Sequence, residues 1–187
     1  SNIPFSFAIM IVEKEMLDID VDFDEGRIGF RTYPLYTKYT WMAPIRAKAK
    51  RIYESYKIKF SPEGDHIPSL LRNLLSSKRK KQNKEIIKTL IEFGRESNLF
   101  DNINITEFGR RNSSPFEIQV EYDGLPIKLT NVGYGVSQSL PLLVEILSAS
   151  KECFSIQQPE VHLHPKAQAA FGSFILNSFK TNKNTFL

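Results

Sequence analysis

Cysteine is nearly absent, since Cys153 is the only one among 187 residues. A single thiol cannot form a disulfide within the chain, which favours a reducing compartment. The neighbouring Phe154 and Ile156 are apolar. The sequence therefore predicts that Cys153 is a small buried hydrophobic residue rather than a reactive thiol.

Long apolar runs are also absent. No stretch approaches the roughly 18 consecutive apolar residues of a membrane-spanning helix. The first residues show no basic segment followed by a cleavage site of small residues, which a signal peptide would have. We therefore expect a cytoplasmic protein with no membrane partner.

Neither sign of charge dominates. The 25 basic and 21 acidic residues give a formal net charge of +4 and a pI of about 9.1. This is less basic than a dedicated nucleic-acid-binding protein is expected to be. The composition, 41% hydrophobic and 25% charged, is that of an ordinary globular protein, and the length suits one domain or slightly more.

The first 40 residues carry the pattern of an antiparallel β-meander. Residues 5–12 favour a strand, and apolar and acidic side chains alternate over residues 17–23. A period of two puts one face of a strand in the core and the other in water. Glu25-Gly26 suits a turn, and residues 28–33 suit the returning strand.

Residues 41–100 are predicted to form a basic, helical insertion. Apolar side chains at helical spacing predict helices over residues 70–75 and 85–93. The basic run between them, residues 76–84, has two open interpretations: a phosphate-binding segment, or a solvated helix face or loop. Together with Arg46–Arg51, it supports a hypothesis that the chain contacts DNA.

Residues 101–187 alternate strands and helices. Strands are predicted near residues 103–105, 116–122 and 125–129, with Asp123-Gly124 as a hairpin turn. The segments that follow are a helix over 137–150, a short strand over 153–157, a helix over 165–180 and a further strand from 185.

The first informative motif is a glycine-rich corner before the helix predicted at 137–150. It reads Asn131-Val132-Gly133-Tyr134-Gly135-Val136-Ser137-Gln138. Its glycines let backbone approach a ligand, Ser137 suits a helix cap, and Pro141 suits the first turn. Free N–H groups at a helix N-terminus bind anions. A structural turn before a core helix explains the same residues equally well.

The second motif follows the short strand and reads Gln157-Gln158-Pro159-Glu160-Val161-His162-Leu163-His164-Pro165. Polar residues at the carboxyl end of a strand are where α/β sheets bind ligands. His162 and His164 are spaced closely enough to share a metal, but no third ligand follows at a recognisable spacing. Hydrogen bonding in a loop or at a subunit contact is the favoured interpretation.

Together the two motifs closely resemble the signature motif, Walker B strand and D-loop of ABC-type ATPases. The OLD-like and SMC-like AAA group, which includes ATPases of bacterial anti-phage systems, is the branch that they resemble most. Ala43-Pro44-Ile45-Arg46 and Arg51-Ile52-Tyr53 also resemble that branch. The resemblance implies an α/β, ABC-ATPase-like P-loop NTPase domain, with a mixed sheet, packed helices and the N-terminal antiparallel β-meander.

The resemblance also implies roles for individual residues. Two such domains sandwich two nucleotides, and the signature corner of one contacts the γ-phosphate held by the other. The positions that match this corner are Gly133, Gly135, Ser137 and Gln138. Gln157 and Gln158 match the positions that hold the magnesium shell and the general base, and Glu160 is the only carboxylate of the motif. The D-loop positions at the dimer contact match His162, Leu163 and His164.

Three departures from the family pattern stand out. No Gly-x-x-x-x-Gly-Lys-Ser/Thr loop is present, since none of the nine glycines precedes a lysine. Gln157 stands where the family usually has an acid, and an amide is a poor magnesium ligand that cannot take a proton. No switch histidine follows the last strand. We expect that further residues supply the Walker A loop. Gln157 is expected to be either a deliberate replacement of a glutamate, of the kind used to trap bound nucleotide, or the sign of a naturally inactive site.

The function expected from the resemblance is an ATP-driven, magnesium-dependent switch. Nucleotide would close a homodimer and so control an effector, such as a nuclease or a toxin in anti-phage defence. The alternative is a catalytically inactive scaffold in a defence or DNA-repair complex, motivated by Gln157 and Gln158. DNA contact is compatible with the first of these.

Overall fold

The computed structural model describes residues 38–54, 59–76, 81–111, 113–182 and 185–186. The strands predicted over residues 5–33 lie outside the described residues, and so do residues 77–80 of the basic run. Within the described ranges, none of the helices combines the length and the apolar content needed to cross a membrane.

Two small sheets organise the described residues. Strands β1 (Lys38–Met42), β5 (Glu152–Ile156) and β6 (Thr185–Phe186) form a parallel sheet in the order β1-β5-β6. In the antiparallel sheet, the order β2-β3-β4 joins Asn102–Glu107, Phe116–Tyr122 and Leu125–Lys128. The hairpin predicted around Asp123-Gly124 is thereby confirmed.

Strand β1 was not expected as part of the parallel sheet. It begins inside the meander predicted for residues 1–40 and runs on into the predicted insertion. Its partner is β5, with Lys38 opposite Glu152 and Met42 opposite Ile156. Because this pairing joins segments more than a hundred residues apart, periodicity within residues 38–42 could not reveal it.

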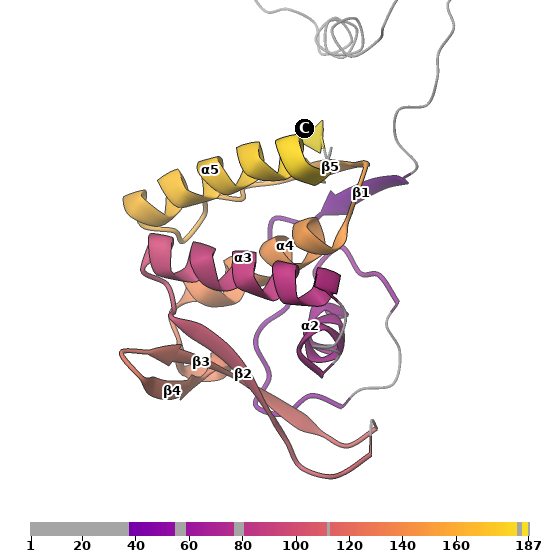
Figure 1. The fold of residues 1–187 in the computed structure, drawn as a ribbon, viewed down its shortest axis with the longest axis vertical. Helices are drawn as coiled ribbons and strands as arrows, with labels where there is room; N and C mark the ends of the chain where they lie inside the picture. The colour runs from indigo at the N-terminus through magenta and orange to yellow at the C-terminus, as the bar shows by residue number, and fades with distance from the viewer. Residues whose placement is uncertain (1–37, 55–58, 77–80, 112, 183–184, 187) are drawn as a thin grey trace, which may run out of the picture. The chain divides into compact units, whose positions relative to one another are not determined.

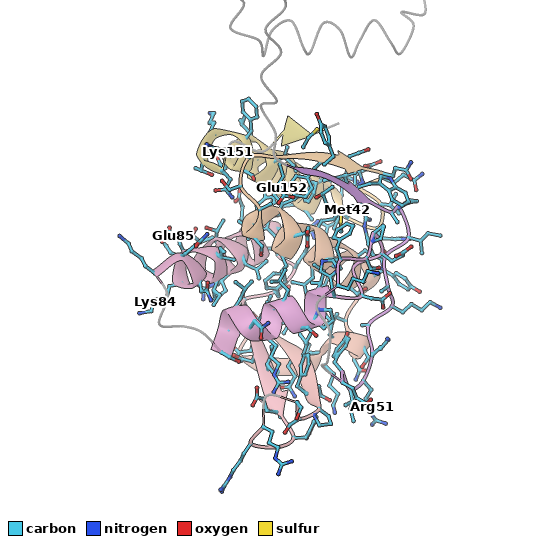
Figure 2. All side chains as sticks on the ribbon, turned by 90° about the vertical axis from the view of Figure 1, so that its right-hand side faces the viewer. Met42, Arg51, Lys84, Glu85, Lys151 and Glu152 are labelled. Atoms are coloured by element: carbon cyan, nitrogen blue, oxygen red, sulfur yellow. The ribbon has the colours of Figure 1, made fainter. Side chains whose placement is uncertain are left out.

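In the described part of the chain, four α-helices pack between and against these sheets. They are α2 (Ile67–Ser76), α3 (Lys81–Ser97), α4 (Tyr134–Ser148) and α5 (Pro165–Asn182). Figures 1 and 2 both show α2, α3 and α4 between the parallel sheet at one end and the antiparallel sheet at the other. The predicted helices are confirmed, and α2 and α3 extend beyond their predicted bounds.

Helix α4 is the centre of the core. Every residue from 138 to 147 is buried, and Leu142, Leu143, Val144 and Ile146 are fully so. A helix that is apolar on all sides must be covered on all sides. The burial predicted for Leu140, Leu143, Val144 and Leu147 and for Cys153 is confirmed.

One polar pair inside this core joins α4 to the start of α2. His66 Nε2 lies 2.8 Å from a carboxylate oxygen of Glu145, and both side chains are buried. His66 Nδ1 accepts the backbone N–H of Ser61 at 3.2 Å. Nδ1 therefore carries no proton, and Nε2 donates to Glu145.

The start of α4 differs from the prediction. The helix begins at Tyr134 with Gly133 at the N-cap, so Ser137 lies inside the helix and does not cap it. The Ser137 hydroxyl donates instead to the carbonyl of Tyr134 at 3.2 Å. Pro141 consequently falls in the helix interior, where its missing N–H leaves the Ser137 carbonyl without its usual partner.

The turn that ends α3 requires a glycine at position 94. Asn98 is left-handed, at φ 55°, and the Leu99 N–H donates to the Gly94 carbonyl at 2.9 Å. This pattern is typical of a Schellman turn. The turn folds Phe100 back onto the helix, where a Cβ built on Gly94 would overlap the Phe100 ring.

We expect Gly94→Ala to lower the free energy of unfolding by about 1–3 kcal/mol, because the added methyl overpacks the buried Phe100. Gly172→Ala is the matched control, since Gly172 also lies in a helix but has open space around its Cβ. That change should stabilise by about 0.5–1 kcal/mol. Urea unfolding measures both, and equal effects would contradict the packing described for Gly94.

Candidate functional site

Strands β1 and β5 end at the same edge of the parallel sheet. The Gln157 N–H donates to the Met42 carbonyl at 3.3 Å, one residue beyond the last paired position. Two segments leave the sheet here, and we name residues 43–53 the arginine segment and residues 157–164 the β5 loop. Ligands of open α/β sheets bind at such carboxyl ends.

The arginine segment is fixed along its length. The N–H of Ala43 donates to Pro62 O at 3.0 Å, and that of Ala47 donates to Glu63 O at 2.8 Å. Tyr53 then forms an isolated antiparallel bridge with Phe116 at the start of β3, and the two rings stack 5.5 Å apart. The segment therefore ties the parallel sheet to the antiparallel sheet, which Figure 2 shows as the path from Met42 to Arg51.

Arg46 is the contact between this segment and the β5 loop. Its Nη2 donates to the Gln157 carbonyl at 3.0 Å and its Nη1 to the Gln158 carbonyl at 3.5 Å. Its backbone N–H donates to Gln138 Oε1, on α4, at 3.2 Å. Arg46 therefore joins the arginine segment, the β5 loop and helix α4.

Burial of Arg46 sets the electrostatics of the site. The residue is only 2% exposed, and desolvation lowers the pKa of its guanidinium. The nearby carboxylate of Glu160 acts in the opposite direction and raises that pKa. Arginine keeps its charge in proteins, so Glu160 is the compensating charge beside a buried cation.

The β5 loop holds two residues in the left-handed backbone region. Gln158 has φ 48° and His162 has φ 65°. Each such residue costs on the order of 1–3 kcal/mol and persists only where its surroundings hold it. The N–H of Val161 donates to Gln158 O at 3.3 Å, and that of Leu163 donates to Glu160 O at 3.1 Å. Tight turns and Arg46 together hold this loop.

The first turn of α4 lies against the same loop. A Cβ built on Gly135 would lie 3.0 Å from the His162 carbonyl oxygen. The rings of Tyr134 and His162 lie 5.2 Å apart and tilted by 46°. The missing side chain of Gly135 therefore lets the backbone of the β5 loop approach α4, and the contact of Gly135 with a nucleotide stays a prediction.

Gly133 has the opposite surroundings. Apart from its two chain neighbours, no atom of the described part of the chain lies within 4 Å of a Cβ built there. Gly133 is the N-cap of α4, so the N–H groups of the first turn and the favourable end of the helix dipole lie next to it, although the Val136 N–H already donates to the Gly133 carbonyl at 3.2 Å. An anion can approach the helix here, which makes Gly133 the position of the corner best suited to a phosphate.

The other two predicted residues of the corner are covered by the protein to different degrees. Gln138 is buried, and its amide oxygen already accepts the Arg46 N–H. Ser137 is half-buried beside a cavity of about 40 Å³ that lies between residues 47–50 and α4. That volume suits water rather than a nucleotide. Gln138 therefore supports the site from within and does not present its side chain to a ligand.

Residues at the end of β5 are displayed to solvent. The side chains of Gln157, Gln158 and Glu160 are exposed, while the carbonyls of the two glutamines face Arg46. The oxygen atoms of these three side chains could bind the water shell of a magnesium ion that arrives with a nucleotide. They do not fit a metal that the protein holds alone, because two of the three carry no charge.

The predicted D-loop residues take three different places. Leu163 is buried in the core of this chain, whereas His162 and His164 are exposed. His164 Nδ1 accepts the Ala167 N–H at 3.3 Å and so caps α5, whose first residue is Pro165. Among the described residues, no group of three or more His, Cys, Asp or Glu is arranged to hold a metal ion.

The burial of Arg46 was not expected from the sequence. Arg46 was grouped with Lys48, Lys50 and Arg51 as a candidate DNA contact, but its side chain is buried and cannot reach a phosphate backbone. Two local signals set it apart: its apolar neighbours Ile45 and Ala47, and its place in Ala43-Pro44-Ile45-Arg46, which resembles the ATPase branch named above. Its carbonyl partners are more than a hundred residues away in the sequence.

A mixed α/β domain whose parallel strands end beside the N-terminus of a central helix is compatible with the P-loop NTPase class. A family model described as the AAA ATPase domain matches residues 14–187. This chain belongs to that family, which suggests nucleotide binding and hydrolysis and the magnesium that accompanies them. No curated protein and no solved structure matches the chain.

Proposed function

We propose that this chain is part of an ATP-hydrolysing switch, in which the glycine corner and the β5 loop form one half of a nucleotide site. The observation that carries the proposal is their junction at Arg46 and Gly135, within an AAA ATPase domain. Two copies would close around ATP, and this closure would control an effector such as a nuclease or a toxin. The signature-like motifs favour an ABC-type arrangement of the OLD-like and SMC-like branch.

The proposed phosphate contact is the N-terminus of α4. Gly133 has open space at its Cβ position, and the N–H groups of Tyr134 and Gly135 in the first turn are suited to the γ-phosphate of a nucleotide held by the partner copy. The exposed His162 and His164 are the proposed dimer contacts. The cradle for the β-phosphate would come from residues outside this sequence, because no Gly-Lys pair occurs in it.

Hydrolysis requires water to attack the γ-phosphorus while the bond to the bridging oxygen breaks, which yields ADP and phosphate. The amide of Gln157 can orient that water, as a glutamine does in several NTPases, but cannot accept its proton. Glu160 is the only carboxylate of the β5 loop and the proposed acceptor. Magnesium bound with the nucleotide would neutralise developing charge, and the oxygens of Gln157 and Glu160 would hold its water shell.

We expect Gly133→Asp to lower ATP turnover by roughly 100-fold in the full-length protein, because a carboxylate would repel the phosphate at this helix N-terminus. The change should not destabilise the fold. Asp is a better N-cap than glycine, so the free energy of unfolding should rise by about 0.3 kcal/mol.

Gly133→Asn is the matched control, since it has nearly the same shape and caps equally well but carries no charge. It should retain most of the turnover. If the Asp and Asn variants hydrolyse ATP equally well, the phosphate site at Gly133 is refuted. Steady-state phosphate release and thermal unfolding measure the two effects.

The scaffold function remains the second candidate, because both exposed side chains at the end of β5 are amides. An inactive domain of this kind would keep its fold and bind a partner without turnover. The two functions differ in what an added carboxylate does at position 157.

We expect Gln157→Glu to raise kcat for ATP by about tenfold or more in the full-length protein, because the new carboxylate can take a proton from water. Gln158→Glu is the control, since it adds the same charge one residue away. No turnover in either variant, with ATP binding intact, would support the scaffold. A gain confined to Gln157→Glu would exclude it.

A further inference from the structure

Arg46 is buried at a cost that the fold does not explain. Its Nε has no hydrogen-bond partner among the described residues, although the side chain is almost completely buried. A buried donor without a partner usually costs about 1–3 kcal/mol. The two bonds that its guanidinium does make go to successive carbonyls of the β5 loop.

Arg72 shows what a buried arginine with a purely structural role looks like in this chain. Its Nε donates to Glu107 at 3.0 Å, and its Nη atoms donate to the carbonyls of Ser114 and Arg111. Its guanidinium also lies 4.9 Å above the Phe116 ring. Every part of Arg72 has a partner, and these partners close the hairpin between β2 and β3.

The carbonyl that Arg46 holds at Gln158 belongs to a strained residue. Because Gln158 is left-handed, its backbone would relax toward a commoner conformation if the guanidinium were removed. Such a change would turn the peptide units on either side. The exposed side chain of Gln157 would then move relative to the corner at Gly133.

The backbone of Arg46 connects the same residue to α4. Its N–H donates to the side chain of Gln138, which lies in the second turn of α4. The link is buried, so water does not compete with it. These hydrogen bonds form a continuous connection from the first turns of α4 through Arg46 to the β5 loop.

We propose that Arg46 is a positioning residue, which holds the end of β5 in its strained conformation and couples it to the glycine corner of α4. The coupling to nucleotide turnover rests on the function proposed above. The positioning itself can be measured without nucleotide.

The first test compares Arg46→Lys with Arg72→Lys by hydrogen exchange in the full-length protein. Each change keeps the charge and removes the two-pronged contact with backbone carbonyls. In Arg46→Lys, the amides of residues 157–164 should exchange about tenfold faster or more, while those of α3 stay unchanged. In Arg72→Lys, faster exchange should be confined to the β2–β3 hairpin. Unchanged exchange over 157–164 in Arg46→Lys would overturn the proposal.

The second test measures ATP turnover in the same two variants. Displaced catalytic groups lower kcat more than they weaken binding, so Arg46→Lys should lower kcat by roughly 10–100-fold and change KM by about threefold or less. Arg72→Lys should leave both near their original values. An equal loss in both variants would reduce Arg46 to a general support of the fold and contradict positioning.

The two tests separate this proposal from the proposed function. If the unmodified protein neither binds nor hydrolyses ATP, the proposed function fails, and the exchange experiment alone decides whether Arg46 positions the loop. If Arg46→Lys does not fold, Gln138→Met replaces it, since it removes the acceptor on α4 and leaves the guanidinium in place. Loop exchange over 157–164 must then rise with the protein still folded, or the coupling is refuted.

Discussion

A buried guanidinium lies at the junction of the candidate site. Arg46 donates to the carbonyls of Gln157 and Gln158, and its own backbone donates to Gln138. Three segments that are distant in the sequence meet at this residue. The glycine corner and the β5 loop also contact each other directly at Gly135 and His162, and Arg46 adds buried hydrogen bonds that link both of them to the arginine segment.

The other features of the candidate site follow from this junction. The β5 loop carries left-handed residues at Gln158 and His162, which are unfavourable in isolation and need surroundings that hold them. Gly135 lacks a side chain, which lets α4 approach the His162 carbonyl closely. Gly133, at the N-cap of the same helix, faces open space. Gly135 therefore lets α4 and the β5 loop pack together, whereas the space around Gly133 is available to a ligand.

Much of the fold could be predicted because its signals are local. Apolar spacing predicted α4 and α5, and Asp123-Gly124 predicted the hairpin of β3 and β4. The start of α4 was misplaced because Gly133 takes the cap position that Ser137 also suits. The burial of Arg46 and the pairing of β1 with β5 depend on contacts across about a hundred residues, and no local pattern reports them.

If the glycine corner and the β5 loop form one site, both should respond when nucleotide binds. Hydrogen exchange of the full-length protein, measured with and without ATP and magnesium, reports on both segments in one experiment. We expect slower exchange on adding ATP for the amides of residues 133–138 and 157–164 together. Protection of only one of these segments, or of neither while ATP is bound, would contradict a single site formed by both.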